Sequence, residues 1–170
     1  MSRLQSFILL CLAALFVIPL SAQQISKEQL IFLTPEWKGE RFADGRPKVP
    51  DNILDRMKLV THEEAWAVLR NENYKHQYDD GWQTINPDSV LVGRAVTAIF
   101  VPGRPDIHRV IDVKGHTKDG RVKSQNSWPI DMLVKRDVYV VDQFSAHEDG
   151  PTIGDNLGNS IFAKTGNGIV

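Results

Sequence analysis

Cysteine is almost absent from this sequence, which excludes disulfide-stabilised small proteins and small proteins built around a cysteine-rich zinc site. Cys11 is the only cysteine in 170 residues, so no internal disulfide and no zinc site built from several cysteines can form. An excess of charge of one sign is also lacking, because 20 lysines and arginines stand against 21 aspartates and glutamates. The resulting net charge of -1 argues against a basic nucleic-acid binder and against an acidic tail. Hydrophobic residues make up 42% of the chain, enough for one packed domain.

The common catalytic and metal-binding motifs are missing as well. The sequence contains no HExxH, CxxC, GxSxG or GxxxxGK[ST], so zinc-protease, thiol-redox, serine-hydrolase and phosphate-loop chemistries have no signature here. The spacing of the histidines suits no common metal site. All five are therefore predicted to be surface or structural residues: His62, His76, His108, His116 and His147.

The first 22 residues differ in composition from the rest of the chain. Arg3 is the only charged residue before Lys27, an apolar run fills 7–20, and small residues follow at 21–22. This order is typical of a secretory signal peptide. A membrane anchor is the weaker interpretation, because a span needs ~20 apolar residues. We expect a cleaved signal at 1–22, export to the periplasm, and no stable membrane span after cleavage.

The remaining chain divides into an arm and one domain. Residues 23–50 carry prolines and glycines at turn positions and are predicted to form an irregular arm. Residues 51–170 alternate helical and strand patterns, which indicates an α/β domain. The patterns predict helices from 51, from 62 after a Thr61/Glu64 capping box, at 106–113, at 128–134 and at 154–164, and strands at 90–101 and 138–141.

The last residues of the chain resemble the beginning of another strand. Ile169 and Val170 are apolar and follow a helix and a Gly-Asn-Gly turn. Strands typically have ~5–6 residues. We therefore expect the chain to be a fragment or a truncated product, with its domain incomplete at the C-terminus.

The segment after the second predicted strand is the candidate site. The strand ends at Asp142, and Gly154 and Asp155 open the next helix. Ligands of open α/β sheets gather at the carboxyl ends of strands, and helix N-termini attract carboxylates and phosphates. Asp155 is predicted to be the N-cap, and Gly154 and Gly158 allow a ligand to approach the backbone. A capped helix with glycines for packing explains the same pattern equally well, so both interpretations stay open.

Carboxylates along this segment suggest a second kind of site. Oxygen ligands suit hard divalent cations, although several carboxylates in one loop are more often solvated than ligating. The four residues concerned are Asp142, Glu148, Asp149 and Asp155.

Three stretches together resemble the family named for the regulator of ribonuclease activity A, which includes 4-hydroxy-4-methyl-2-oxoglutarate aldolases. They are 137–142 (DVYVVD), 153–157 (IGDNL) and 166–170 (GNGIV), with 92–98 (VGRAVTA) and the helix at 61–69 in the same order as in the family. The resemblance covers about residues 50–170. It implies a compact α/β/β swivelling domain of the phosphohistidine type, assembled as a homotrimer or hexamer with active sites between subunits.

The resemblance also implies a function. In the aldolases of the family, backbone amides of a Gly-Asp-x-Leu stretch hold the pyruvate part of the substrate, which maps onto Gly154, Asp155, Asn156 and Leu157. The family's substrate-contacting arginine and its aspartate, which anchors Mg²⁺ through water, map beyond Val170, so no catalytic residue or metal ligand is assigned within the chain. We expect a divalent-metal-dependent class II aldolase or decarboxylase of small oxo-acids, or part of one. The alternative is a non-catalytic binding protein of the same fold.

Overall fold

The structure is a computed structural model that describes residues 25–143 and 153–170. The predicted signal segment 1–22 lies outside the described residues. The chain forms two compact units that divide between Lys48 and Val49. Among the described helices, none is both long and apolar enough to span a membrane.

The first unit contains a helix where an irregular arm was predicted. α2 (Lys27–Leu33) begins with a reciprocal capping box, because the Ser26 hydroxyl accepts from the Gln29 N–H at 3.2 Å and the Gln29 side chain accepts from the Ser26 N–H at 3.1 Å. The Arg41 guanidinium then stabilises the following turns by donating hydrogen bonds to Thr34 O and Gly45 O, both at 2.8 Å. The prolines and glycines of this segment shape its turns, but they lie after the helix and do not prevent it.

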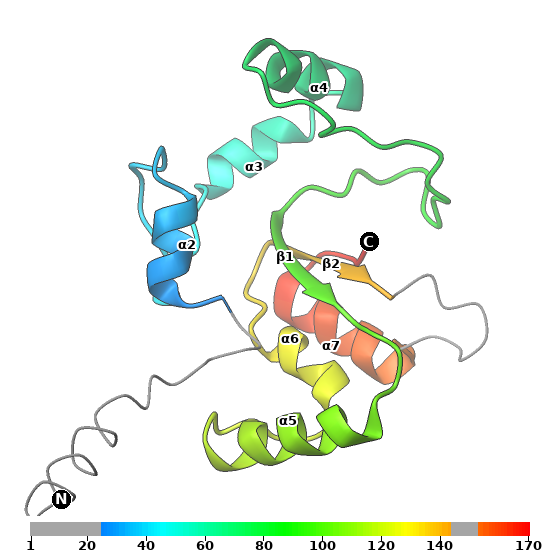
Figure 1. The fold of residues 1–170 in the computed structure, drawn as a ribbon. Helices are drawn as coiled ribbons and strands as arrows, with labels where there is room; N and C mark the ends of the chain where they lie inside the picture. Colours follow the sequence, from blue (N-terminus) through cyan, green and yellow to red (C-terminus); the bar gives the residue numbers. More distant parts are fainter. Residues whose placement is uncertain (1–24, 144–152) are drawn as a thin grey trace, which may run out of the picture. The chain divides into compact units, whose positions relative to one another are not determined.

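The second unit combines helices with a small parallel sheet (Figure 1). This confirms the coarse α/β class. Its elements are α3 (Asp51–Met57), α4 (His62–Asn71), β1 (Arg94–Ile99), α5 (Pro105–Thr117), η1 (Gln125–Ser127), α6 (Trp128–Asp131), β2 (Asp137–Asp142) and α7 (Asp155–Thr165).

The two strands run parallel and in a fixed register. β1 pairs with β2 from Arg94 opposite Asp137 to Ile99 opposite Asp142. Ile169 forms a parallel bridge with Tyr139, and the Val170 N–H donates to Tyr139 O at 2.9 Å. The strand-like character predicted for the last two residues is therefore confirmed as a bridge to β2. Because β1 and β2 run parallel, their carboxyl ends lie at the same edge.

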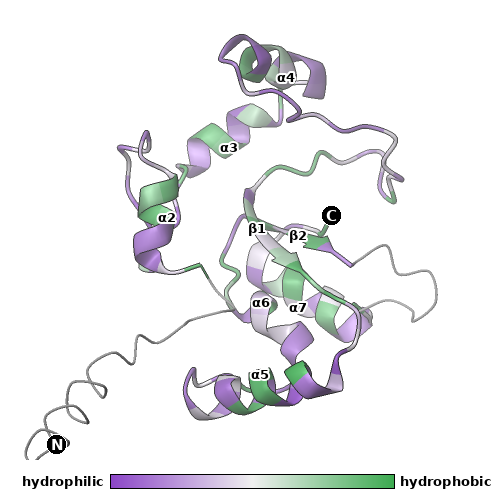
Figure 2. Ribbon diagram, viewed as in Figure 1, coloured by the Kyte–Doolittle hydropathy of each residue, from purple (hydrophilic) through white to green (hydrophobic). Residues whose placement is uncertain are grey.

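The core lies between the sheet and the helices α6 and α7, which cover one face of it (Figure 1). Figure 2 shows apolar residues along the strands and on part of α7. The buried cluster consists of Val96, Ile130, Leu133, Tyr139 and Ile161. Burial of such side chains contributes about 1.5–3 kcal/mol each, which makes this cluster the main source of cohesion in the unit.

Gly115 of α5 marks the closest packing between α5 and α6. A Cβ at Gly115 would lie 2.2 Å from the Trp128 ring, so only glycine fits. The Trp128 indole N–H donates to Val122 O at 3.0 Å, and the ring meets His116 edge-on. This contact explains why α5 continues to Thr117, beyond its predicted end at 113.

Other predicted boundaries differ by a few residues. β1 is shorter than the predicted strand 90–101, because only its central six residues find a partner in β2. The helix predicted at 128–134 ends at Asp131. The Thr61/Glu64 capping box is confirmed, with the Thr61 hydroxyl accepting from the Glu64 N–H at 3.2 Å and the Glu64 carboxylate accepting from the Thr61 N–H at 2.9 Å.

Candidate functional site

The candidate site lies where β2 ends and α7 begins. β2 ends at Asp142, and its last carbonyl accepts from the Phe100 N–H at 2.8 Å, which fixes the carboxyl edge of the sheet. The described chain resumes at Ile153, and α7 starts two residues later. Ile153 packs against the buried cluster beneath the sheet. The start of α7 is therefore anchored to the core by this apolar contact.

The N-cap of α7 is Gly154, so the prediction that Asp155 caps the helix is wrong. Gly154 has extended backbone angles (φ -102, ψ -170), and Asp155 is the first helical residue. The Asp155 carboxylate accepts from the next amide, Asn156 N–H, at 2.8 Å. A carboxylate in the first turn stabilises the helix through the positive end of the helix dipole. Asp155 thus still supports the helix N-terminus, although it does so from inside the helix.

Two backbone amides at this end remain available. Within the described part of the chain, no group accepts a hydrogen bond from the Asp155 or the Leu157 N–H. The next amide, Gly158 N–H, already bonds to Gly154 O at 2.9 Å. The four predicted ligand-binding residues therefore form one continuous turn. The Asp155 and Leu157 amides have no acceptor among the described residues, whereas the Asn156 amide is occupied by its neighbour.

The side chains of this turn divide into an inner and an outer set. Leu157 packs against the buried cluster together with Ile153. Asp155 and Asn156 are exposed. A Cβ added at Gly154 or Gly158 would meet no described atom within 4 Å. Close packing against described residues therefore does not explain these two glycines.

The predicted cation site receives no support from the described residues. Asp142 and Asp155 are described, whereas Glu148 and Asp149 lie outside the described residues. Across 25–143 and 153–170, no three His, Cys, Asp or Glu side chains lie together as metal ligands would. No metal ligand is therefore assigned to a described residue.

His116 has a structural role, as predicted. Its Nδ1 lies 2.8 Å from Arg121 O and its Nε2 lies 3.4 Å from the Asp112 carboxylate. Both ring nitrogens are therefore occupied in holding the end of α5 to the turn that follows. His147 lies outside the described residues.

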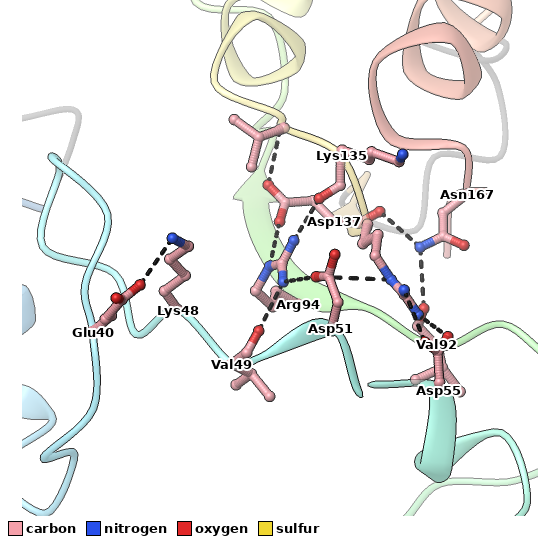
Figure 3. Close-up of polar contacts among 12 residues, drawn as sticks. Glu40, Lys48, Val49, Asp51, Asp55, Val92, Arg94, Lys135, Asp137 and Asn167 are labelled. Atoms are coloured by element: carbon pink, nitrogen blue, oxygen red, sulfur yellow. Dashed lines mark hydrogen bonds and ion pairs between the residues drawn. The ribbon is translucent and has the colours of Figure 1, made fainter. Parts of the chain in front are cut away.

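A charged cluster at the opposite, amino-terminal edge of the sheet was not predicted from the sequence (Figure 3). The Arg94 guanidinium donates to the Asp137 carboxylate at 3.2 Å, to Val49 O at 2.8 Å and to the Asp51 carboxylate at 3.2 Å. Asp137 is 0% exposed and also accepts from the Val134 N–H at 3.0 Å. The sequence shows that each strand begins with a charged residue, Arg94 or Asp137. It does not show that these two residues lie opposite each other, because that depends on the register of the two strands.

One buried polar group in the core has no partner among the described residues. The Tyr139 hydroxyl is buried and makes no hydrogen bond there. Burial raises the pKa of the Tyr139 phenol to about 12, because the phenolate is poorly solvated in the core. The phenol is therefore neutral over the whole physiological range.

Comparison of the chain with protein-family models, with curated proteins and with solved structures finds no match.

Proposed function

We propose that the chain binds the carboxylate of a pyruvate-type oxo-acid at the N-terminus of α7. One observation carries this proposal. α7 begins at the carboxyl edge of a parallel sheet with an unobstructed glycine, Gly154, and with the Asp155 and Leu157 amides unused by described residues. Amides at such a helix end carry partial positive charge and suit a carboxylate. The resemblance to the aldolase family assigns the same four residues, Gly154 to Leu157, to the pyruvate part of the substrate.

The reaction we propose is class II aldol cleavage or decarboxylation of an oxo-acid. The amides of α7 would fix the carboxylate and orient the oxo group, which is the positioning part of catalysis. In the related aldolases a bound divalent cation such as Mg²⁺ supplies a Lewis acid for the developing enolate. The described residues do not gather a ligand set for it, and the resemblance maps the metal-anchoring aspartate and the substrate arginine beyond Val170. No catalytic step is therefore assigned to a residue of this chain.

The same resemblance supports the finer fold and assembly. We propose a swivelling domain of the phosphohistidine type, a homotrimer or hexamer, and export by the predicted signal at 1–22. The order β1, α5 and α6, β2, α7 and the parallel bridge at Ile169 support the proposed fold. The proposed assembly rests on the resemblance alone, and the proposed export rests on the composition of residues 1–22.

A non-catalytic binding protein of the same fold is the second candidate function, and one contact favours it. The Asp155 carboxylate already holds the Asn156 amide at 2.8 Å. It thereby occupies one of the amides that a carboxylate ligand would use and adds a negative charge beside the other two. Because the Asp155 carboxylate competes with a ligand for this site, the site suits weak or regulated binding better than rapid turnover.

Calorimetric titration with pyruvate and oxaloacetate, followed by an assay of Mg²⁺-dependent oxaloacetate decarboxylation, tests the proposal. Gly154→Val should weaken binding at least about tenfold, a change of about 1.4 kcal/mol, because its side chain would cover the free amides. Gly103→Val is the matched control, since Gly103 also has nothing within 4 Å of a Cβ but lies outside the site. Equal binding by both variants contradicts the site. Binding without decarboxylation favours the non-catalytic function.

A further inference from the structure

α3 carries one buried side chain and a set of charged contacts to residues at the start of the two strands. Leu54 is 4% exposed and is the only buried residue of this seven-residue helix. A helix of two turns is unstable by itself in water. Its position at the amino-terminal edge of the sheet therefore depends on what Leu54 and the charged side chains contribute.

The charged contacts join two carboxylates of α3 to Arg94 of β1 and to Arg136, which directly precedes β2 (Figure 3). Asp51 pairs with Arg94 at 3.2 Å and lies 3.9 Å from the Arg136 guanidinium. Asp55 accepts two hydrogen bonds from Arg136.

Arg94 is more deeply buried than the two α3 carboxylates, Asp51 and Asp55. The Arg94 side chain is 9% exposed and is fixed by the buried Asp137, so the sheet side is already organised. The Asp51 and Asp55 side chains are 60% and 59% exposed. Ion pairs of this kind are open to solvent on one side and are therefore sensitive to salt.

The chain between α3 and β1 forms a lobe, defined here as residues 58–90, that contains α4 and the following loop. Its hydrogen bonds are local, such as the capping box at Thr61 and the bond from Ser89 N–H to Asn86 O at 3.3 Å. Within the lobe, the Trp66 ring lies 5.6 Å from the Tyr78 ring, and the Arg70 guanidinium lies 5.3 Å from Trp66. The lobe is thus held together internally, while its attachment at the α3 end depends on α3.

We infer that α3 is an electrostatic latch that fixes the lobe to the amino-terminal edge of the sheet through Asp51 and Asp55, and that higher ionic strength releases it while the sheet stays folded. Salt screens the two exposed carboxylates from Arg94 and Arg136. The Arg94–Asp137 pair is buried and is screened much less. The latch therefore opens at a lower energetic cost than the core, as expected for a local opening rather than global unfolding.

Hydrogen exchange of the full chain, measured by mass spectrometry at 0.05 M and 0.5 M NaCl, tests the latch. Exchange in a peptide covering 50–59 should accelerate roughly three- to tenfold at the higher salt, from the loss of two exposed ion pairs. Exchange in a peptide covering β2 should stay constant. A second variant addresses the cause: in Asp51→Asn with Asp55→Asn, exchange at 50–59 should be fast at both salt concentrations.

The matched control replaces two other exposed aspartates, Asp79→Asn with Asp88→Asn, which form no ion pair among the described residues. This control should keep the salt dependence of the unmodified chain. The latch is overturned if salt leaves exchange at 50–59 unchanged, or if it accelerates exchange in β2 by the same factor. It is also overturned if the Asp51/Asp55 variant retains the full salt dependence.

Discussion

Asp137→Asn is the most informative single change to the stability of the second unit. Asp137 is 0% exposed, pairs with Arg94 at 3.2 Å and accepts from the Val134 N–H at 3.0 Å. Asparagine has nearly the same shape but lacks the negative charge. Its amide NH₂ would also replace one of the two carboxylate oxygens that accept hydrogen bonds from Arg94 and from the Val134 N–H. The change therefore leaves the Arg94 guanidinium without its buried counter-charge, in a position where the side chain is 9% exposed.

The size of the effect follows from the surroundings of Arg94. Breaking a buried ion pair by removing one partner costs about 3–5 kcal/mol. Arg94 keeps contacts with Val49 O and the Asp51 carboxylate, at 2.8 and 3.2 Å, so we expect the lower end, about 3 kcal/mol. Domains of this size are stable by about 5–15 kcal/mol in total. The variant should therefore be folded but markedly less stable.

Urea unfolding followed by tryptophan fluorescence measures this loss. The midpoint should fall while the slope of the free energy of unfolding against urea stays unchanged, which indicates a change in stability and not in the unfolded state. Asp106→Asn is the control, because its ion pair with Arg104 is shorter, at 2.7 Å against 3.2 Å, but exposed on both sides. We expect no measurable change there. A loss below about 1 kcal/mol in Asp137→Asn would refute the reasoning, since that is the ordinary effect of an arbitrary substitution.

Three further predictions concern the core and the latch. Gly115→Ala should lower the free energy of unfolding by about 1–3 kcal/mol and alter Trp128 fluorescence, because a Cβ would lie 2.2 Å from that ring; unchanged stability would contradict the close packing. The raised pKa of Tyr139, about 12 against an ordinary 10.0, means that the contribution of Tyr139 to stability is fully present below pH 10 and is lost as the pH rises toward 12; Tyr139→Phe should remove this loss, and its persistence would assign it to other groups. The hydrogen bonds from Arg136 lower the pKa of Asp55 from its ordinary 3.8, so its contribution to stability is present above that pH and is lost as the pH falls through the folded pKa. The protection of the amides in 50–59, measured relative to their intrinsic exchange rates, should therefore fall in that acid range, and unchanged protection would contradict the role of Asp55.

Local signals in the sequence predicted the local structure well. The Thr61/Glu64 capping box and the helix beginning after Pro50 are confirmed, because each depends on residues three or four apart. Runs of neighbouring apolar and β-branched residues predicted both strands, which is also a local signal. The missed helix α2 carried a comparable signal, since Ser26 and Gln29 have the capping-box spacing. The prolines and glycines that favoured an irregular arm lie beyond the end of this helix and do not argue against it.

Long-range contacts could not be predicted in the same way. Arg94 and Asp137 are 43 positions apart, and Arg136 and Asp55 are 81 apart. The parallel register of β1 and β2 brings Arg94 and Asp137 together. The second pair depends on the placement of α3 beside the turn before β2. At the candidate site, the sequence predicted where α7 begins but assigned the N-cap to Asp155, because a sequence does not show whether an aspartate beside a glycine lies before or inside the helix. The distinction matters chemically, since it decides which amides remain free.

The amide resonances of Asp155 and Leu157 provide the most direct test of carboxylate binding at α7. Two-dimensional ¹H–¹⁵N spectra of the full chain should be recorded while pyruvate is added to millimolar concentration. The account predicts that these two amides shift together and saturate, while the Asn156 amide, held by the Asp155 carboxylate at 2.8 Å, shifts less. Gly154→Val should abolish the shifts. If Asp155 and Leu157 do not respond to pyruvate, the N-terminus of α7 is not a carboxylate site and the central claim is wrong.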